Sequence, residues 1–534
     1  MNKILKNPSL LSLSGAILLW AGWPSSYLFP LLFLGMAAFL LSAKLMNDRG
    51  FKGPKYFLIL FLGLLLWNVA TTWWIKNATW AGMLMAVIGN SLLMYLPFLV
   101  YRWGHKAKIG KLGVLTFVSC WLAFEYLHHN WSLSWPWISL GNGMAKFPEL
   151  IQWYEYTGAG GGSLWIILIN VMIFNMVTSQ DFSKVRWGKL LLLITFPMLV
   201  SQVVKLKYGN DAEDIHVQTV EVVVLQPNFN TYTQKSSWGE EYIPRKEQVS
   251  RMINSSTQQI TQQTAFLVWP ETAITGKIQE EKFNKSFVYF ELQRFLLKYP
   301  NLTLVAGIDT YEFCEDQDNP RDYAGYSSRS GYYEPYNAAL MMSKDTVGFY
   351  HKSKFVPGAE QVPFPWLIKP LELLLGGVGF GHYFGQDDQI PFVSTKGIKA
   401  SAGICYESIY GEHMAEFVNN GAQIQFVITN DDWWHDTEGH RQHYEYARLR
   451  VIETRKPLAR SGNTGFSGFF DIFGNDTQKT AYRVDGCIKQ DLKLNNYVTF
   501  YSKHGDFIGR ISSFFAICFL LSILVRRVTL KKSI

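Results

Sequence analysis

Charged residues are scarce in this sequence. Asp, Glu, Lys and Arg make up only 17% of its 534 residues, whereas 48% are hydrophobic and 16% are aromatic. Soluble globular domains carry about 25% charged residues. The composition therefore excludes a wholly soluble chain and predicts that part of it lies in a membrane. The chain is also too long for one ordinary domain, and it contains neither an internal repeat nor a low-complexity tract.

Cysteine is scarce as well, with five in the chain. Cys120 and Cys518 fall in apolar stretches, so the long polar segment holds only Cys314, Cys405 and Cys487. An odd number excludes complete disulfide pairing in an oxidising compartment. If Cys405 is a reactive thiol, Cys314 and Cys487 form either a disulfide or two unpaired thiols.

Spacings typical of metal sites are absent. Three histidines, His435, His440 and His443, follow Asp431 and Asp432, but the chain has neither a CxxC nor an HExxH pattern. We therefore expect no metal site and no cofactor.

Long apolar stretches recur along the chain. The first, 7–43, is interrupted by Trp-Pro-Ser-Ser at 23–26 and is expected to form two short tilted spans. A helix needs about 20 residues to cross the hydrocarbon layer. The remaining stretches bring the expected number of spans to eight, and they are 56–75, 77–101, 112–126, 163–178, 190–204 and 511–525.

Basic residues gather on one side of these spans and predict their orientation. Basic loops mark the cytoplasmic side of a membrane, so both termini are expected in the cytoplasm and the long segment before the last span outside it. We attribute the formal net charge of +8 to the basic loops that orient the spans, and not to a nucleic-acid-binding surface. A cleaved signal peptide is the competing interpretation of the N-terminus. The basic segments are 3–6, 44–55, 102–111, 184–189 and 526–532.

The segment between the seventh and eighth spans alternates between strand-like and helical patterns. Such alternation is typical of a layered α/β fold. The polar stretch 313–335 is expected to be a surface loop. The expected helices are 243–262 and 280–298, and the expected strands are 217–225, 265–268, 302–308, 338–342, 398–404 and 423–429.

A candidate nucleophile stands where one of these strands ends. Cys405 follows the apolar run 399–404 and precedes a helical pattern at 408–419 that Ser408 is able to cap. At a helix N-terminus the backbone N–H groups favour a thiolate and also stabilise an oxyanion. The competing interpretation is a buried structural cysteine.

Two further segments carry charged residues just after strand-like runs. Glu271 belongs to Trp-Pro-Glu at 269–271, and Lys352 belongs to Tyr-His-Lys at 350–352. Alone, each is most simply a surface residue. Together, Glu271, Lys352 and Cys405 resemble the Glu-Lys-Cys catalytic triad of the nitrilase superfamily.

The chain as a whole resembles the apolipoprotein N-acyltransferase family over almost its entire length. The stretch VPGAEQVPF provides Glu360, and CYE provides Tyr406 and Glu407 next to the nucleophile. Residues 429–434 and 501–506 resemble two further motifs of that family.

This resemblance implies a fold and a domain organisation. The fold would be a multi-span α-helical membrane domain joined to an α/β nitrilase-like domain, an α-β-β-α sandwich. The seven-span domain would comprise 1–205, the extracytoplasmic catalytic domain 206–506, and the last span with its basic tail 507–534. The protein would be a monomer in the bacterial inner membrane, with cytoplasmic termini and a periplasmic catalytic domain.

The resemblance also implies a reaction. Cys405 would take an acyl chain from a phospholipid as a thioester and pass it to the α-amine of a diacylated apolipoprotein. Glu271 would be the base, and the Lys352 ammonium with the Tyr406 backbone N–H would stabilise the oxyanions. Glu360 would orient Lys352, and Glu407 would support the Cys405 turn.

Aromatic residues are the candidates for lipid contact. The stretch 363–384 combines Trp366 with leucines and glycines and is expected to be a lid that dips into the interface. Trp433 and Trp434 either line the acyl entrance or pack in the core, and Trp238 is a weaker candidate.

Two other functions remain open from the residues alone. A membrane-anchored amidase or nitrilase would use the same triad on a small amide, and a non-catalytic scaffold would keep only the fold. The intact triad argues against the scaffold, and the apolar stretch 363–384 argues against the hydrolase.

Overall fold

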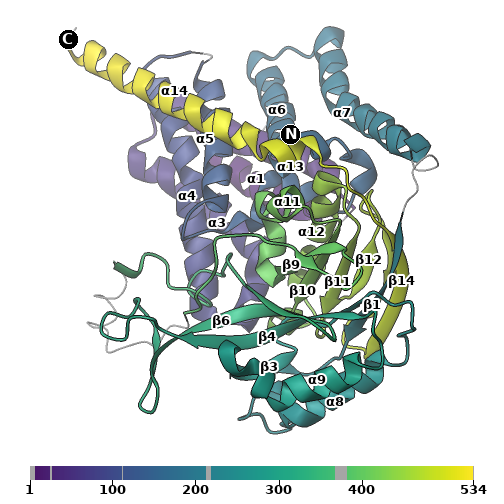
Figure 1. The fold of residues 1–534 in the computed structure, drawn as a ribbon. Helices are drawn as coiled ribbons and strands as arrows, with labels where there is room; N and C mark the ends of the chain where they lie inside the picture. Colours follow the sequence, from purple (N-terminus) through teal and green to yellow (C-terminus); the bar gives the residue numbers. More distant parts are fainter. Residues whose placement is uncertain (1–5, 25–26, 111, 212–217, 367–381, 533–534) are drawn as a thin grey trace. The chain divides into compact units, whose positions relative to one another are not determined.

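The structure is a computed structural model that describes residues 6–24, 27–110, 112–211, 218–366 and 382–532. The chain forms two compact units, one comprising residues 1–210 with 504–534 and the other residues 211–503. The first is helical and the second contains the sheets (Figure 1).

Each apolar stretch predicted from the sequence falls on a helix of the first unit. Six helical stretches in the described part of this unit are long and apolar enough to cross a membrane. Of the other two helices, α1 has 14 residues and α5 has 18. At 1.5 Å per residue, α1 extends about 21 Å and is shorter than a hydrocarbon layer of about 30 Å. The helices are α1 (Pro8–Ala21), α2 (Leu32–Asp48), α3 (Gly53–Thr72), α4 (Trp80–Lys106), α5 (Leu112–His129), α6 (Tyr154–Ser179), α7 (Lys184–Asp211) and α14 (Phe507–Lys532).

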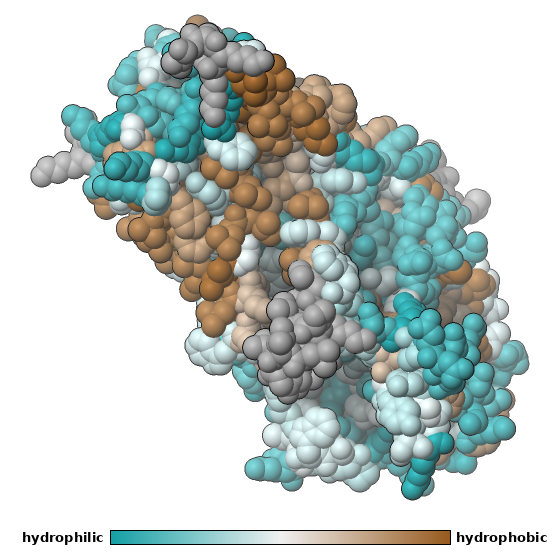
Figure 2. Space-filling model, turned by 90° about the vertical axis from the view of Figure 1, so that its left-hand side faces the viewer, coloured by the Kyte–Doolittle hydropathy of each residue, from teal (hydrophilic) through white to brown (hydrophobic). Residues whose placement is uncertain are grey.

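Helices of this unit pack through small residues and buried amides. A Cβ on Gly35 of α2 would lie 2.5 Å from Leu19 Cγ of α1, so the glycine permits their close contact. The buried Asn90 side chain donates to Asn68 Oδ1 at 2.7 Å and joins α4 to α3. On the face that Figure 2 shows, apolar side chains cover much of this unit, as expected of helices that face lipid.

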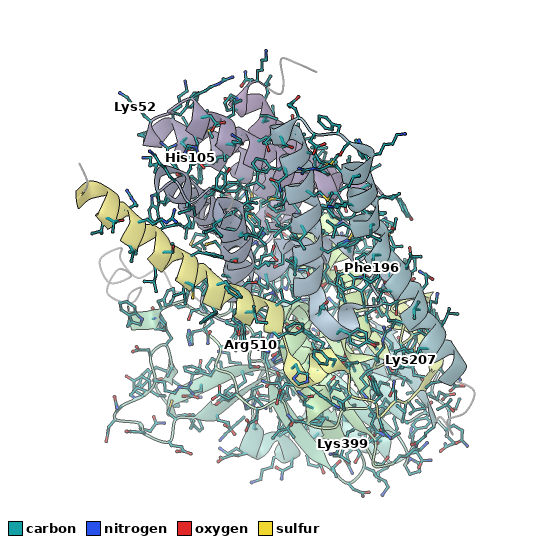
Figure 3. All side chains as sticks on the ribbon, turned by 90° about the horizontal axis from the view of Figure 1, so that it is seen from above. Lys52, His105, Phe196, Lys207, Lys399 and Arg510 are labelled. Atoms are coloured by element: carbon teal, nitrogen blue, oxygen red, sulfur yellow. The ribbon has the colours of Figure 1, made fainter. Side chains whose placement is uncertain are left out.

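Polar residues mark the two ends of this helical unit. Lys52 and His105 lie together at one end, whereas Lys207 and Arg510 lie toward the other, and Phe196 lies between them on α7 (Figure 3). The helix α7 exposes 59% of Phe196 and 66% of Val203, which is the pattern of a lipid-facing helix and not of a water-exposed one.

The second unit contains two sheets that pack face to face. The first sheet has the order β14-β1-β2-β4-β6-β5, with β3 paired to β4 and β7 to β6, and the second has the order β13-β12-β11-β10-β9-β8. The strands are β1 (Thr219–Gln226), β2 (Phe266–Val268), β3 (Ile274–Gln279), β4 (Thr303–Phe313), β5 (Gly325–Ser327), β6 (Gly331–Met342), β7 (Val347–His351), β8 (Phe392–Val393), β9 (Lys399–Ile404), β10 (Ile424–Thr429), β11 (Leu458–Gly462), β12 (Gly468–Phe470), β13 (Asp476–Lys479) and β14 (Gly486–Lys493).

Side chains alternate between the two faces of each strand, so each sheet packs against the other sheet on one face and against helices on the other. Val222 and Val224 of β1 face the core between the sheets, where they meet Phe426 of β10. Val223 faces the other way, toward Leu292 and the other residues of the helical layer. Helices α8 (Arg245–Ser256) and α9 (Phe287–Leu296) cover the first sheet, and α11 (Gly411–Asn419) and α12 (Glu438–Thr454) cover the second (Figure 1). The predicted α-β-β-α sandwich is therefore confirmed.

Two local predictions are corrected. The stretch 313–335 is not simply a loop, because it includes β5 and the start of β6, which pair as an antiparallel hairpin. The predicted helix after Cys405 begins later, at Gly411, because Tyr410 is extended and interrupts it. Ser408 does not cap that helix, and Cys405 instead begins a short 3-10 turn, Cys405–Ile409.

Candidate active site

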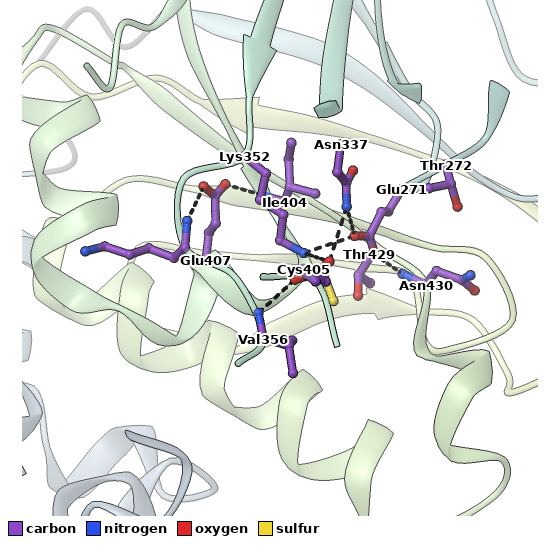
Figure 4. A network of polar contacts seen from close by, with 12 residues as sticks. Glu271, Thr272, Asn337, Lys352, Val356, Ile404, Cys405, Glu407, Thr429 and Asn430 are labelled. Atoms are coloured by element: carbon purple, nitrogen blue, oxygen red, sulfur yellow. Dashed lines mark hydrogen bonds and ion pairs between the residues drawn. The ribbon is translucent and has the colours of Figure 1, made fainter. Parts of the chain in front are cut away.

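The three predicted catalytic residues follow three strands of the two sheets. Glu271 follows β2, Lys352 follows β7 and Cys405 follows β9. They converge in one buried cluster, where Lys352 Nζ lies 3.2 Å from Glu271 Oε1 (Figure 4). The exposed fraction is 0% for Lys352, 4% for Glu271 and 8% for Cys405. The fold thus brings together groups that are far apart in the sequence.

Glu271 is held at both carboxylate oxygens. Asn337 Nδ2 donates to Oε1 at 2.8 Å, and the Asn430 backbone N–H donates to Oε2 at 3.0 Å. Gly307 on the neighbouring β4 permits the close approach of this loop, since a Cβ there would lie 2.4 Å from Glu271 Cα. The next residue, Thr272, has a φ of 47°, a strained conformation of the kind found at functional sites.

Glu360 is the second carboxylate on Lys352. Its Oε1 lies 2.6 Å from Lys352 Nζ, and its Oε2 accepts the Val356 backbone N–H at 2.9 Å. Burial alone would lower the pKa of Lys352, but Glu271 and Glu360 outweigh it and hold that pKa well above its usual value. Lys352 is therefore a fixed ammonium. Burial raises the pKa of Glu360 although Lys352 opposes the change.

Glu407 joins the lysine loop to the cysteine turn. Its Oε2 accepts the Ile404 backbone N–H at 2.8 Å, and its Oε1 accepts the Ser353 N–H and the Tyr350 hydroxyl, each at 2.7 Å. Burial alone would raise its pKa, but His413 and these N–H donors outweigh it and lower the pKa. Glu407 is thus a buried carboxylate anion that connects the residue before Cys405 to the residue after Lys352.

Cys405 sits at a strained turn whose carbonyl group is anchored. Its φ is 51°, and its carbonyl oxygen accepts from Ser408 Oγ at 2.7 Å and lies 3.2 Å from His443 Nε2. In a trans peptide the N–H points away from the preceding carbonyl. Holding the Cys405 carbonyl therefore fixes the direction of the N–H group of Tyr406.

Burial keeps the Cys405 thiol protonated. Desolvation and then the Glu271 carboxylate raise its pKa well above the usual value, and Lys352 only partly opposes them. The expectation that a helix N-terminus favours the thiolate is wrong here, because the turn is a single short 3-10 segment in an apolar, acidic surrounding. A nucleophilic role for Cys405 therefore requires a neighbouring base that takes the thiol proton.

A buried network lies next to the nucleophile. His443 Nδ1 lies 3.0 Å from Asp431 Oδ1, and Arg460 lies 2.6 Å from Asp431 Oδ2. Donor atoms of Cys405, Asp431 and His443 come within 4.8 Å of one another, as at a metal site. However, both ring nitrogens of His443 and both Asp431 oxygens already have hydrogen-bond partners, so a cation would have to displace Arg460. These contacts favour a hydrogen-bonded network that supports the Cys405 turn over a metal site.

The predicted tryptophans lie in different surroundings. Trp434 is half-buried and meets His443 edge-on at 5.6 Å, whereas Trp433 is 40% exposed and meets Tyr232 at 5.4 Å. Trp238 is 85% exposed and Trp366 is 72% exposed. Most of the predicted lid, residues 367–381, lies outside the described residues.

Sequence reasoning missed several residues of this site. Asn337, His443 and Arg460 were not singled out for a role, and Asn430 was seen only as part of a motif. Asn337 had a detectable signal, because it is a polar residue directly before the apolar run 338–342 of β6. Cys314 and Cys487 are both free thiols and do not form the disulfide that was one of the two expected alternatives.

Comparisons with known proteins agree with this architecture. A family model for the N-terminal domain of apolipoprotein N-acyltransferase matches residues 15–172, and a carbon-nitrogen hydrolase model matches residues 234–496. An apolipoprotein N-acyltransferase of Chlorobaculum tepidum is 28% identical, covering 96% of this chain and 95% of that protein. This chain belongs to the apolipoprotein N-acyltransferase family.

Other members of the apolipoprotein N-acyltransferase family are similar over comparable lengths. The Geobacter metallireducens protein of that name is 26% identical, covering 93% of this chain and 91% of that protein. Among solved structures, the nitrilase-superfamily member Nit3 of Saccharomyces cerevisiae covers 52% of this chain and 90% of its own, with 14% identity and a TM-score of 0.36. The predictions of an N-acyltransferase enzyme and of a membrane-integral protein are confirmed.

Proposed function

We propose that this enzyme transfers an acyl chain from a glycerophospholipid, through a Cys405 thioester, to the N-terminal α-amine of a diacylglyceryl-cysteine lipoprotein. The observation that carries the proposal is the buried Glu271–Lys352–Cys405 cluster in a chain that also has apolar spans. A membrane-tethered thiol meets ester carbonyls of phospholipids more often than any other acyl donor.

In the first half-reaction the Cys405 sulfur attacks the ester carbonyl carbon. Glu271 takes the thiol proton as the C–S bond forms, since the thiol is neutral at rest. The Lys352 ammonium and the Tyr406 N–H stabilise the tetrahedral oxyanion. The C–O bond then breaks, Glu271 returns the proton to the departing oxygen, and lysophospholipid leaves.

In the second half-reaction the α-amine of the acceptor attacks the thioester carbonyl. Glu271 removes a proton from that nitrogen, the C–N bond forms, and the same two donors stabilise the second oxyanion. When the C–S bond breaks, the Cys405 sulfur recovers a proton from Glu271. Glu360 and Asn337 hold Lys352 and Glu271 in place throughout.

The test is a gel assay for covalent acyl-enzyme, using the purified protein and phospholipid with a labelled acyl chain. We expect a hydroxylamine-sensitive label on the wild type and none on Cys405→Ala. Acyl transfer to a diacylglyceryl-cysteine peptide by Cys405→Ala at the wild-type rate would overturn the mechanism. Release of free fatty acid from a small amide, without transfer to the peptide, would instead support a membrane-anchored hydrolase.

The orientation in the membrane is part of the same proposal. The basic loops support cytoplasmic termini, and the catalytic unit would then lie in the periplasm. Reporters fused after Lys52 or Lys108 should behave as cytoplasmic, and a reporter fused near Glu280 should behave as periplasmic. A cytoplasmic signal near Glu280 would contradict this orientation.

A further inference from the structure

Asp309 is a carboxylate next to the site that the reaction above leaves without a role. It lies on β4 two residues after Gly307, the glycine that packs against Glu271, so the two residues share one face of the strand. In the sheet it pairs directly with Asn337 of β6, whose side chain donates to Glu271. Asp309 therefore lies directly opposite the residue that hydrogen-bonds to Glu271.

One oxygen of Asp309 is buried without a hydrogen-bond partner. Among the residues that the structure describes, none donates to its Oδ1 atom. Burial raises the pKa of this carboxylate, whereas the Gly276 backbone N–H favours its ionised form and acts to lower the pKa. Buried carboxylate oxygens are rarely left unsatisfied, because desolvation without a partner is costly. The Oδ1 atom is therefore available to a donor from a ligand.

The charges around Asp309 favour a cationic ligand. The nearest ammonium, Lys235, is buried and donates to Thr272 Oγ1 at 3.1 Å. Lys277 also acts on Asp309 but is exposed to solvent, and Tyr383 faces it as a neutral phenol. Three carboxylates, those of Glu271, Glu360 and Asp309, thus face two buried ammonium groups, those of Lys352 and Lys235.

We propose that Asp309 binds the N-terminal α-ammonium group of the acyl acceptor. This assignment rests on the function proposed above and names the group that selects the acceptor. An ammonium ion would donate one N–H to Asp309 Oδ1 and a second N–H to Glu271. Glu271 removes that second proton, and the nitrogen lone pair attacks the thioester carbonyl while Asp309 keeps its hydrogen bond. Glu271 gives this proton to the Cys405 sulfur as the C–S bond breaks, and the other proton that the nitrogen loses passes to the Asp309 carboxylate and from there to solvent.

This arrangement also explains how an amine is chosen over water. Water carries no charge and gains little from the extra carboxylate, whereas a primary ammonium balances it. The site therefore recruits the acceptor before it is deprotonated. Loss of the Asp309 charge should slow aminolysis and leave thioester formation intact.

The experiment separates the two half-reactions in the full-length protein with Asp309→Asn. Asparagine keeps the shape of the side chain but has no charge. Acyl-enzyme is first formed with labelled phospholipid and then discharged by either a diacylglyceryl-cysteine peptide or hydroxylamine, a neutral nucleophile. We expect acyl-enzyme formation and discharge by hydroxylamine within about twofold of the wild type. Discharge by subsaturating peptide should be roughly ten- to a hundredfold slower.

The matched control is Glu312→Gln, the same chemical change three residues along β4 and on the opposite face of the strand. It should match the wild type in all three steps. Equal peptide discharge by Asp309→Asn and the wild type would overturn the assignment, and so would a loss of acyl-enzyme formation in Asp309→Asn. Absence of acyl-enzyme in the wild type would refute the proposed function itself, together with this assignment.

The pH dependence gives a second readout. Burial raises the pKa of Asp309 to about 6, with Lys235 opposing and Glu271 reinforcing the change. Because the carboxylate binds the ammonium only when ionised, the KM for the peptide should rise as the pH falls below about 6. In Asp309→Asn this rise should disappear. A rise of equal size in the variant would contradict the assignment.

Discussion

Two buried networks of charged side chains adjoin Cys405, and they differ in how their charges are matched. We call Glu271, Lys352 and Glu360 the reactive network and Asp431, His443 and Arg460 the supporting network. In the reactive network two carboxylates share one ammonium, and burial raises the pKa of Glu360. In the supporting network, Arg460 and then His443 outweigh the effect of burial and hold the pKa of Asp431 well below its usual range.

The comparison shows how one fold uses the same residue types for opposite purposes. A network with an excess carboxylate can take up a proton, and it lies beside a neutral thiol that must lose one. A fully matched network resists protonation and instead fixes geometry, here the carbonyl of Cys405 through His443. Changes in the reactive network should therefore affect rates, and changes in the supporting network should affect stability.

The largest effect is expected from Glu271→Gln, which removes the proposed base from the reactive network. Both half-reactions should slow by about a hundred- to ten-thousandfold, because each needs a proton transfer. The free energy of unfolding should change much less than the rates, since one of the two donors, Asn337 Nδ2 or the Asn430 N–H, keeps the amide oxygen as its acceptor. Burst release of lysophospholipid and thermal unfolding measure the two quantities. A variant that unfolds early would show that the reactive network also supports the fold.

A large loss of stability is expected from Arg460→Leu in the supporting network. Removing one partner of a buried ion pair costs about 3–5 kcal/mol, because Asp431 is left charged and unmatched. Thermal unfolding of the purified protein measures this loss. The control is Arg441→Leu. The Arg441 side chain is 46% exposed, so its ion pair with Asp436 should contribute about 1 kcal/mol or less. Equal unfolding temperatures for the two variants would contradict the distinction.

The smallest effect is expected on the acidity of Cys405 itself. The Glu271 carboxylate raises the pKa of the thiol and Lys352 lowers it. Glu271→Gln should therefore move the pH profile for alkylation of Cys405 to lower pH, and Lys352→Met should move it to higher pH. The displacement should differ in sign between the two variants. The rate of iodoacetamide labelling between pH 7 and pH 11 measures it, and shifts in the same direction would contradict the opposed roles.

Much of the site was predictable from short sequence patterns. Glu271, Lys352 and Cys405 each follow a strand-like run, and their order along the chain pointed to one superfamily. By contrast, nothing local marks His443 or Arg460 as neighbours of Cys405. They lie on α12 and β11, and only the packing of the second sheet brings them together. The protonated state of the thiol was likewise not predictable, because it depends on burial and on charges from distant segments.

The sequence by itself determined the apolar spans, the alternation of strands and helices and the choice of Glu271, Lys352 and Cys405 as the proposed reacting groups. These features depend on composition, on periodicity and on residues next to one another in the chain. Only the tertiary structure decided which carboxylates share Lys352, which groups hold the Cys405 carbonyl and which oxygen of Asp309 stays unmatched. Those properties come from strand register and burial, because hydrogen bonds and charge interactions act over a few ångströms between segments that can be far apart in sequence.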